Sequence, residues 1–216
     1  YMEMYAITVG PIQENCYFLI GDHENDTIIF DPGEQAEDII AAIEENALHP
    51  IAIVLTHAHY DHIGALETIR EKYDVPVYQN PIEREWLLDP QLNGSARNPN
   101  VPDVRLAKEA DVFFEEMGPY EIGEFRFEMQ HIPGHSPGST VFIFRENGFA
   151  IVGDVIFKGS VGRSDLPGGS HETLIEGIQK YIVTLPGETV LFPGHGDPTT
   201  VREEIYSNPY LNGATR

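Results

Sequence analysis

The first thirty residues alternate short apolar runs with polar turn residues. The apolar runs have the length of strands, and Gly, Pro, Asn and Asp lie between them. This pattern is typical of a β-meander. The three expected strands are YAITV at 5–9, CYFLI at 16–20 and TIIF at 27–30.

The pattern then changes to an alternation of helices and strands. Residues 34–48 carry Ile39, Ile40, Ile43 and Ala47 at helical spacing, with acidic residues between them, which predicts an amphipathic helix. A continuous apolar run at 51–56 predicts a buried strand. The same reasoning predicts a helix over 63–73 and a strand over 75–80.

The middle of the chain contains a segment that has no clear period. Residues 89–111 are rich in Asn, Pro and Asp, and we expect a long surface excursion there. A helix is expected at 171–185, because Leu174, Ile178 and Ile182 fall on one face. The remaining expected strands are 125–129, 140–144, 149–154 and 189–192.

This order of elements predicts an α/β domain with two sheets and helices packed outside them. The 216 residues fit one large domain, and the sequence contains no repeat or linker. We therefore expect a single domain over 1–216. The polar loops after several strands carry His or Asp, and ligands commonly bind at the carboxyl ends of strands in such sheets.

Composition narrows the classes of partner. Thirteen Lys and Arg residues against 35 Asp and Glu residues give a net charge of −22, which disfavours nucleic acid and anionic membranes as partners. The single cysteine, Cys16, lies in an apolar run and excludes an internal disulfide. No secretory signal and no apolar run long enough to span a bilayer is visible, so we expect a cytoplasmic protein.

The segment LTHAHYDHIG at 55–64 concentrates His57, His59, Asp61 and His62 within six positions. A polar loop without a function is the alternative to a metal site. Imidazole and carboxylate are common ligands of zinc and similar divalent ions. Six residues cannot easily direct four ligands to one ion, whereas two neighbouring ions would divide them into pairs.

Three further candidate ligands also lie at or just beyond expected strands. His135 stands in IPGHSPGST, Asp154 ends the run FAIVGD, and His195 stands in LFPGHGD. Gly or Pro flanks each histidine and Gly precedes Asp154, which permits tight turns of the backbone. The sequence therefore predicts a metal site that combines these residues with the 57–62 cluster.

Taken together, these motifs resemble the metal-ligand set of the metallo-β-lactamase fold superfamily, and the resemblance covers essentially the whole chain. It implies an αββα sandwich of two mixed β-sheets flanked by helices, with the site at one edge. In that family pattern His57, His59 and His135 hold the first metal ion. Asp61, His62 and His195 hold the second, and Asp154 bridges both.

Within the superfamily the chain resembles the short, single-domain glyoxalase II-like (hydroxyacylglutathione hydrolase-like) group, most clearly in GDVIFKGSVGRSDLPGG at 153–169. This implies a binuclear hydrolase that cleaves S-2-hydroxyacylglutathione thioesters, such as S-lactoylglutathione, by a metal-bound hydroxide. Asp61 and Asp154 are the candidate catalytic residues, and Arg163 and Lys158 the candidate substrate contacts. Zinc is the leading metal, with iron or manganese as alternatives, and we expect a monomer or weak homo-oligomer.

The chain departs from the family pattern around glutathione. We expect no counterpart of the helical C-terminal domain of classical glyoxalase II, since 21 residues follow His195. Asp165 stands where the family has a tyrosine, and the family's tyrosine after the last histidine is absent too. The alternatives are persulfide dioxygenase activity, hydrolysis of lactones, β-lactams or other esters on the same fold, and a metal-binding protein without catalysis.

Overall fold

The computed structural model describes residues 2–212, and its contacts group them into two compact units. The first unit contains the described residues through Glu115 together with 122–125. The second contains 116–121 and the described residues from Arg126 onward. Each unit is built on one six-stranded sheet.

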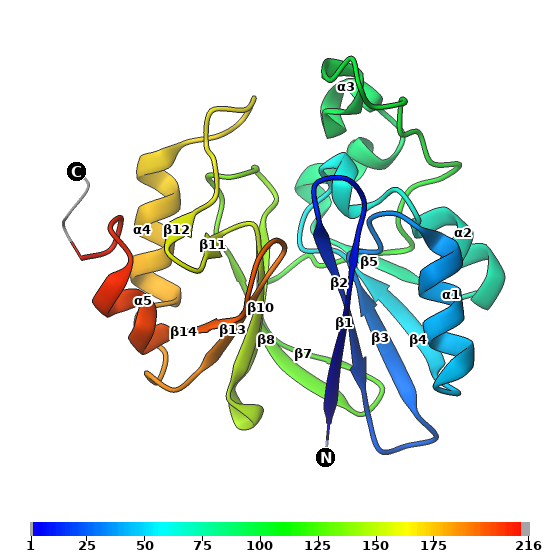
Figure 1. The fold of residues 1–216 in the computed structure, drawn as a ribbon, viewed down its shortest axis with the longest axis horizontal. Helices are drawn as coiled ribbons and strands as arrows, with labels where there is room; N and C mark the ends of the chain where they lie inside the picture. The colour runs from blue at the N-terminus through cyan, green and yellow to red at the C-terminus, as the bar shows by residue number, and fades with distance from the viewer. Residues whose placement is uncertain (1, 213–216) are drawn as a thin grey trace. The chain divides into compact units, whose positions relative to one another are not determined.

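The sheet of the first unit has the strand order β1-β2-β3-β4-β5-β6. The pairs β1–β2 and β2–β3 are antiparallel, and the next three pairs are parallel. Figure 1 shows α1 and α2 lying beside this sheet. The elements are β1 (Glu3–Val9), β2 (Glu14–Ile20), β3 (Asp26–Phe30), α1 (Ala36–Glu45), β4 (His49–Val54), η1 (Tyr60–His62), α2 (Leu66–Tyr73), β5 (Val77–Gln79), η2 (Pro81–Leu87), α3 (Pro90–Asn93), η3 (Ser95–Arg97) and β6 (Val112–Phe113).

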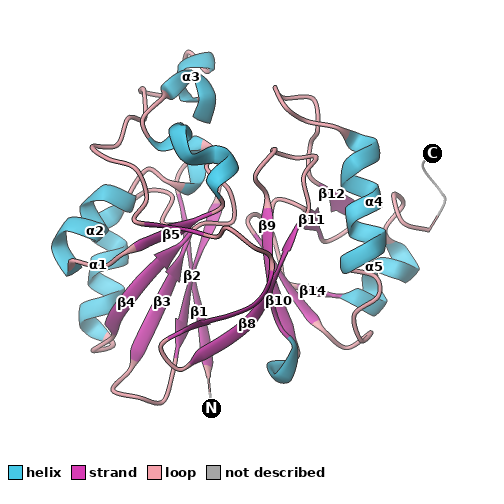
Figure 2. Ribbon diagram, turned by 180° about the vertical axis from the view of Figure 1, so that it is seen from behind, coloured by secondary structure: helices cyan, strands magenta, loops and turns pink. Residues whose placement is uncertain are grey.

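The sheet of the second unit has the order β14-β13-β10-β9-β8-β7. Strands β10 and β13 are parallel, whereas β8–β9, β9–β10 and β13–β14 are antiparallel. Figure 2 shows α4 and α5 beside the β10–β14 part of this unit. The elements are β7 (Gly118–Ile122), β8 (Phe125–His131), β9 (Thr140–Phe144), η4 (Arg145–Asn147), β10 (Phe149–Gly153), β11 (Ile156–Phe157), β12 (Ser160–Val161), α4 (His171–Tyr181), β13 (Val190–Pro193), β14 (Thr199–Thr200) and α5 (Val201–Ser207).

Each unit has its own apolar core, and the predicted helix faces supply part of it. Ile39 and Ile43 of α1 are buried, as are Leu174 and Ile178 of α4. Ala47 does not extend the α1 face, because the helix ends at Glu45 and Ala47 is exposed with a φ of +50°. The predicted α/β class with two mixed sheets is confirmed.

Cys16 is fully buried on β2. Burial, with the nearby charges of Glu14 and Asp31, raises the pKa of its thiol well above the usual range. The thiol is therefore neutral at physiological pH, as expected of an inert core residue.

The segment predicted as an excursion at 89–111 is more structured than its composition indicates. It contains α3 and η3, and Asn93 within it is fully buried. The Asn93 side-chain amide donates to the carbonyls of Trp86 (2.9 Å) and Val104 (2.8 Å). Side-chain hydrogen bonds hold this segment in place, so its sequence lacks the apolar periodicity from which helices are predicted.

Within residues 2–212, no helix is both long enough and apolar enough to cross a membrane.

Candidate metal centre

In the first unit the candidate ligands follow β4, and the loop after β3 supports them. Because β3 and β4 are parallel neighbours, the loops that follow them begin at the same edge of the sheet. The Asp31 N–H donates to the carbonyl of Val54, 3.2 Å away, which ties the two strand ends together. Asp31 therefore lies beside the loop that carries His57, His59, Asp61 and His62.

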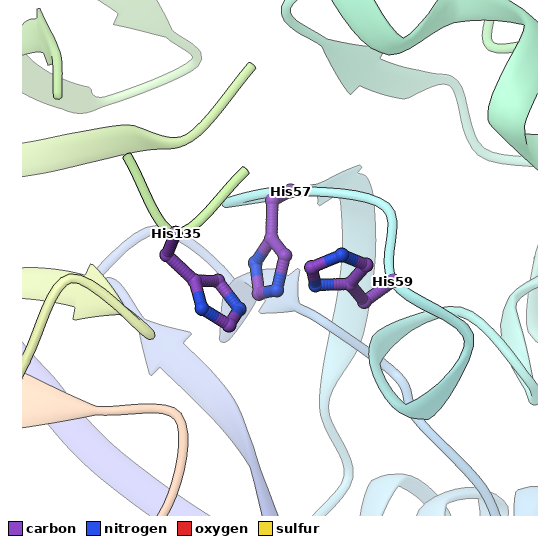
Figure 3. Close-up of side chains that lie close together, drawn as sticks. All are labelled: His57, His59 and His135. Carbon is purple, nitrogen blue, oxygen red and sulfur yellow. The ribbon is translucent and has the colours of Figure 1, made fainter. Parts of the chain in front are cut away.

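The three imidazoles of this loop are buried and close together. His57, His59 and His62 are 2%, 5% and 0% exposed. The ring centroids of His57 and His59 are 4.9 Å apart, with the rings perpendicular, and those of His57 and His62 are 4.2 Å apart. In Figure 3 the His57 and His59 side chains extend from this loop with their rings adjacent. Such dense packing of buried ring nitrogens is a geometry suited to metal ligation.

A hydrogen-bond chain indicates which nitrogen of the His57 and His62 rings carries the proton. The Thr56 hydroxyl donates to Asp31 Oδ2 (2.5 Å), so its oxygen accepts from His57 Nδ1 (3.0 Å). His62 Nδ1 donates to Asp31 Oδ2 (2.7 Å). Both rings therefore direct the lone pair of Nε2 away from this chain, which is how metal-binding histidines are usually oriented.

Asp31 supports the neighbouring loop through hydrogen bonds. Its carboxylate also accepts from the backbone N–H of Thr56 at 2.8 Å, so its oxygens receive three hydrogen bonds in all. Three of the about four acceptor sites of a carboxylate are therefore engaged by protein donors. The Asp31 side chain thereby holds both Thr56 and His62.

Asp61 and His62 have the separation expected of two ligands on one ion. Asp61 Oδ2 lies 3.4 Å from His62 Nε2, which is longer than a normal hydrogen bond. Two ligand atoms, each bonded at ~2.1 Å to a tetrahedral ion, are about 3.4 Å apart.

Two residues of η2 hold this loop from a distant part of the sequence. The Ala58 N–H donates to Glu83 Oε1 (2.7 Å), and the ring of Trp86 lies 5.3 Å from that of His59. Glu83 is 1% exposed. Sequence reasoning missed both residues because they lie some 25 positions downstream in a segment with no recognisable motif.

In the second unit, strand ends again bring the candidate ligands together. Asp154 directly follows β10, and His195 follows the parallel neighbour β13. The Gly194 N–H donates to the Gly153 carbonyl at 2.8 Å and holds the two ends side by side. His135 lies between β8 and β9, at the same edge, because β9 begins where its antiparallel partner β10 ends.

The Asp154 carboxylate lies between two imidazoles. Its Oδ2 is 3.4 Å from His135 Nε2 and 3.5 Å from His195 Nε2. His135 Nδ1 donates to the Arg163 carbonyl at 2.8 Å, and since a carbonyl only accepts, this ring also presents the lone pair of Nε2. Each distance is close to the ~3.4 Å expected of two ligands on one tetrahedral ion, so Asp154 is placed to share an ion with either histidine.

The residues of both units fit divalent metal ions. Three imidazoles have Nδ1 engaged by an oxygen acceptor of the protein. Buried Glu14 adds a further carboxylate 3.5 Å from His62 Nδ1. Nitrogen and oxygen donors of this kind suit zinc, iron and manganese. The roles of the seven individual ligands remain predictions.

The predicted substrate contacts are less buried than the ligands. Lys158 and Arg163 are both exposed, Lys158 on the turn between β11 and β12. The Arg163 guanidinium donates to the Asp165 carboxylate through Nε (2.8 Å to Oδ1) and Nη2 (2.9 Å to Oδ2). The arginine expected to contact substrate is therefore paired with a carboxylate of the same chain.

Comparison with known proteins gives matches over nearly the whole chain. A family model described as the metallo-beta-lactamase superfamily matches residues 9–195. The probable metallo-hydrolase YqgX of Bacillus subtilis is 46% identical over 212 residues, which cover 98% of this chain and 99% of the relative. Hydroxyacylglutathione hydrolase GloC of Haemophilus influenzae is 36% identical over 211 residues, which cover 98% of this chain and 99% of the relative.

Two solved structures are similar over the same extent. The crystal structure of BLEG-1 B3 metallo-beta-lactamase has a TM-score of 0.94 and 43% identity, and the match covers 98% of this chain and all of that one. TTHA1623, crystallised in a di-iron-bound form, has a TM-score of 0.80 and 36% identity, with 96% of this chain and all of that one covered.

Proposed function

The chain belongs to the metallo-β-lactamase superfamily as a metallo-hydrolase, and we propose that its seven predicted ligands hold two metal ions. His57, His59 and His135 hold one ion in this proposal. Asp61, His62 and His195 hold the other. Asp154 bridges the two ions. The observation that carries the proposal is the position of Asp154 Oδ2 between His135 Nε2 and His195 Nε2.

We propose that the reaction is hydrolysis of a thioester. When bound, two divalent ions supply deprotonated water at neutral pH and polarise the substrate carbonyl. Either Asp61 or Asp154 would accept the one proton that the water loses, and the hydrogen-bonded rings of His57, His62 and His135 would keep the site rigid. The water oxygen bonds to the carbonyl carbon, the C–S bond breaks, and a carboxylate and a thiol result. A thiolate, with a thiol pKa of about 8.5, leaves without a dedicated general acid.

The proposed substrates are S-2-hydroxyacylglutathione thioesters, with S-lactoylglutathione as the test compound. The Haemophilus relative named hydroxyacylglutathione hydrolase supports this choice, at 36% identity over nearly the full length of both chains. Arg163 and Lys158 are the proposed contacts to the glutathione portion. Zinc is the proposed metal, and iron is the alternative because TTHA1623 is di-iron-bound.

A second candidate is hydrolysis of a β-lactam. The solved structure at a TM-score of 0.94 is described as a B3 metallo-beta-lactamase. The same ligands would serve this reaction, because both substrates present a carbonyl to a nucleophilic water. Thioester hydrolysis is preferred on account of the glyoxalase-like segment 153–169.

Parallel assays of the metal-loaded protein separate these candidates. We expect turnover of S-lactoylglutathione with kcat/KM at least tenfold above that of a chromogenic cephalosporin. Oxygen uptake with glutathione persulfide tests the dioxygenase alternative in the same preparation. Faster hydrolysis of the cephalosporin, or oxygen uptake without thioester cleavage, would overturn the proposed function.

A further inference from the structure

The Arg163–Asp165 pair has the geometry with which arginine recognises a carboxylate. Nε and Nη2 of the guanidinium donate to separate oxygens of Asp165, at 2.8 and 2.9 Å. Two parallel N–H···O bonds of this kind are the most specific way for arginine to bind a carboxylate. Asp165 therefore uses the donors that a carboxylate of the substrate would use.

The backbone of this segment is fixed against two metal-ligand candidates of the same unit. The Arg163 carbonyl accepts from His135 Nδ1, and the Gly162 N–H donates to the Val155 carbonyl at 3.1 Å. A Cβ at Gly162 would lie 1.9 Å from the backbone oxygen of Asp154, so only glycine permits this approach. The backbone of Arg163 consequently lies beside these ligand candidates, while its side chain extends to solvent and is 61% exposed.

The charge of the pair matters because the chain has few cations. Thirteen Lys and Arg residues stand against 35 acidic residues. The hydrogen bonds from Arg163 lower the pKa of Asp165 to about 2, so Asp165 is ionised throughout the neutral range. The pair is thus neutral overall, and Arg163 attracts a substrate anion less than an isolated arginine would.

We propose that Asp165 is a specificity residue that competes with the substrate for Arg163. It weakens the binding of thioesters whose thiol portion brings a carboxylate to Arg163, and it relatively favours thioesters of thiols without one. This inference rests on the proposed thioester hydrolysis. Because the pair is exposed and such pairs are weak, a substrate carboxylate can displace Asp165, and the expected change in preference is modest.

The test compares Asp165→Ala with the wild-type protein on two thioesters. S-lactoylglutathione carries carboxylates on its thiol portion, and S-lactoyl-N-acetylcysteamine carries none. We expect the ratio of the two kcat/KM values to shift toward the glutathione thioester by about two- to fivefold, within the upper part of the range that the energies of exposed ion pairs imply. The change should appear in KM, because the pair acts on binding and not on the reacting atoms.

Two further variants make the result specific. In an Arg163→Ala background the Asp165→Ala shift should disappear, since the competition needs the guanidinium. Glu188→Ala removes one carboxylate from another exposed pair of this unit, that with Arg202 at 3.8 Å, and should leave the ratio unchanged. An equal change on both substrates, or a shift that persists without Arg163, would show that Asp165 acts only through general charge or structure.

Calorimetric titration with S-methylglutathione, which is not hydrolysed, measures the same competition without turnover. We expect Asp165→Ala to lower its Kd by about the same two- to fivefold. Absence of hydrolysis of both thioesters by the metal-loaded wild type would refute the proposed function. Hydrolysis with unchanged KM and Kd in Asp165→Ala would refute this inference alone.

Discussion

The loop after β4 and the segment after β12 both carry residues of the proposed site, and they are held in contrasting ways. In the first, His57 and His62 are almost fully buried, and their Nδ1 atoms are bonded to Thr56 and Asp31. In the second, Arg163 has a fixed backbone but an exposed side chain, whose partner Asp165 is 69% exposed. The geometry of the proposed ligands is thus built into the folded chain, whereas the proposed substrate contact can exchange partners with solvent and solutes.

This difference sets the size of the effects expected from mutation. A buried ligand cannot be replaced by water or by a neighbouring side chain without reorganising the site, so its loss is costly. An exposed ion pair contributes little to stability, and its substitution changes preference more than activity.

The largest effect is expected from Asp154→Ala, which removes the proposed bridge between the ions. We expect metal content to fall from about two ions per chain toward one, and kcat/KM for S-lactoylglutathione to fall about 10²–10³-fold, because metal polarisation contributes several kcal/mol. Elemental analysis and steady-state kinetics measure the two quantities. Asp197→Ala, which removes an exposed carboxylate two residues after His195, serves as the control. A variant at position 154 with full metal content and normal rate would contradict the bridging role.

A smaller effect is expected from Asp31→Asn, which leaves every proposed ligand in place. Asn tolerates the φ of +52° at this position but cannot accept all three hydrogen bonds that Asp31 receives. We expect metal affinity to fall about 10–100-fold, the usual consequence of losing a partner of a ligating histidine. Competition with a chromogenic chelator measures the change.

The matched control for this prediction is Asp26→Asn. Asp26 Oδ1 lies 2.6 Å from His49 Nδ1, which is the same kind of interaction, but the His49 side chain is 62% exposed and belongs to neither ligand set. Metal affinity should be unchanged in this variant. Equal losses from both substitutions would mean that Asp31 has no particular connection to the ligands.

The smallest effect concerns pH and the Arg163–Asp165 pair. Arg163 lowers the pKa of Asp165 from 3.8 to about 2. The stabilisation of a carboxylate with a lowered pKa is fully present above its unfolded pKa and is lost as the pH falls through the folded value. The KM ratio between the wild type and Asp165→Ala should therefore stay constant from about pH 6 to 9. A ratio that changes steeply within this range would show that another titrating group controls Arg163.

The loops that carry the proposed ligands could be identified from the sequence because each loop directly follows a strand. Asp154 directly after an apolar run and His195 after a run ending in Pro-Gly are local signals, and parallel pairing of β10 and β13 brings them together. Short elements such as β6, β11, β12 and β14 contain two residues each, too few for a hydrophobic period. Glu83 was missed because its contact with Ala58 depends on the folded path of η2 and not on any motif.

The proposed substrate contact, Arg163, could be predicted from the sequence only in part. The position of Arg163 follows from its resemblance to a family motif, but its pairing with Asp165 depends on side-chain conformation at the surface. Residues two apart have no fixed relation outside regular structure, so no pattern in the sequence indicates this pairing. The sequence shows that Asp165 replaces the family's tyrosine. The structure adds that the Asp165 carboxylate accepts two hydrogen bonds from Arg163.

Anomalous X-ray scattering from crystals of the metal-loaded protein tests the central claim most directly, namely that the seven proposed ligands hold two metal ions. Data collected on both sides of the metal absorption edge locate each ion independently of any assumed ligand. We predict two peaks roughly 3.5–4 Å apart, the usual spacing of two-metal sites. One peak should be bound by His57, His59 and His135, the other by Asp61, His62 and His195, with Asp154 between them. A single peak would contradict this claim. Two peaks, neither of which is bound by Asp154, would contradict it as well.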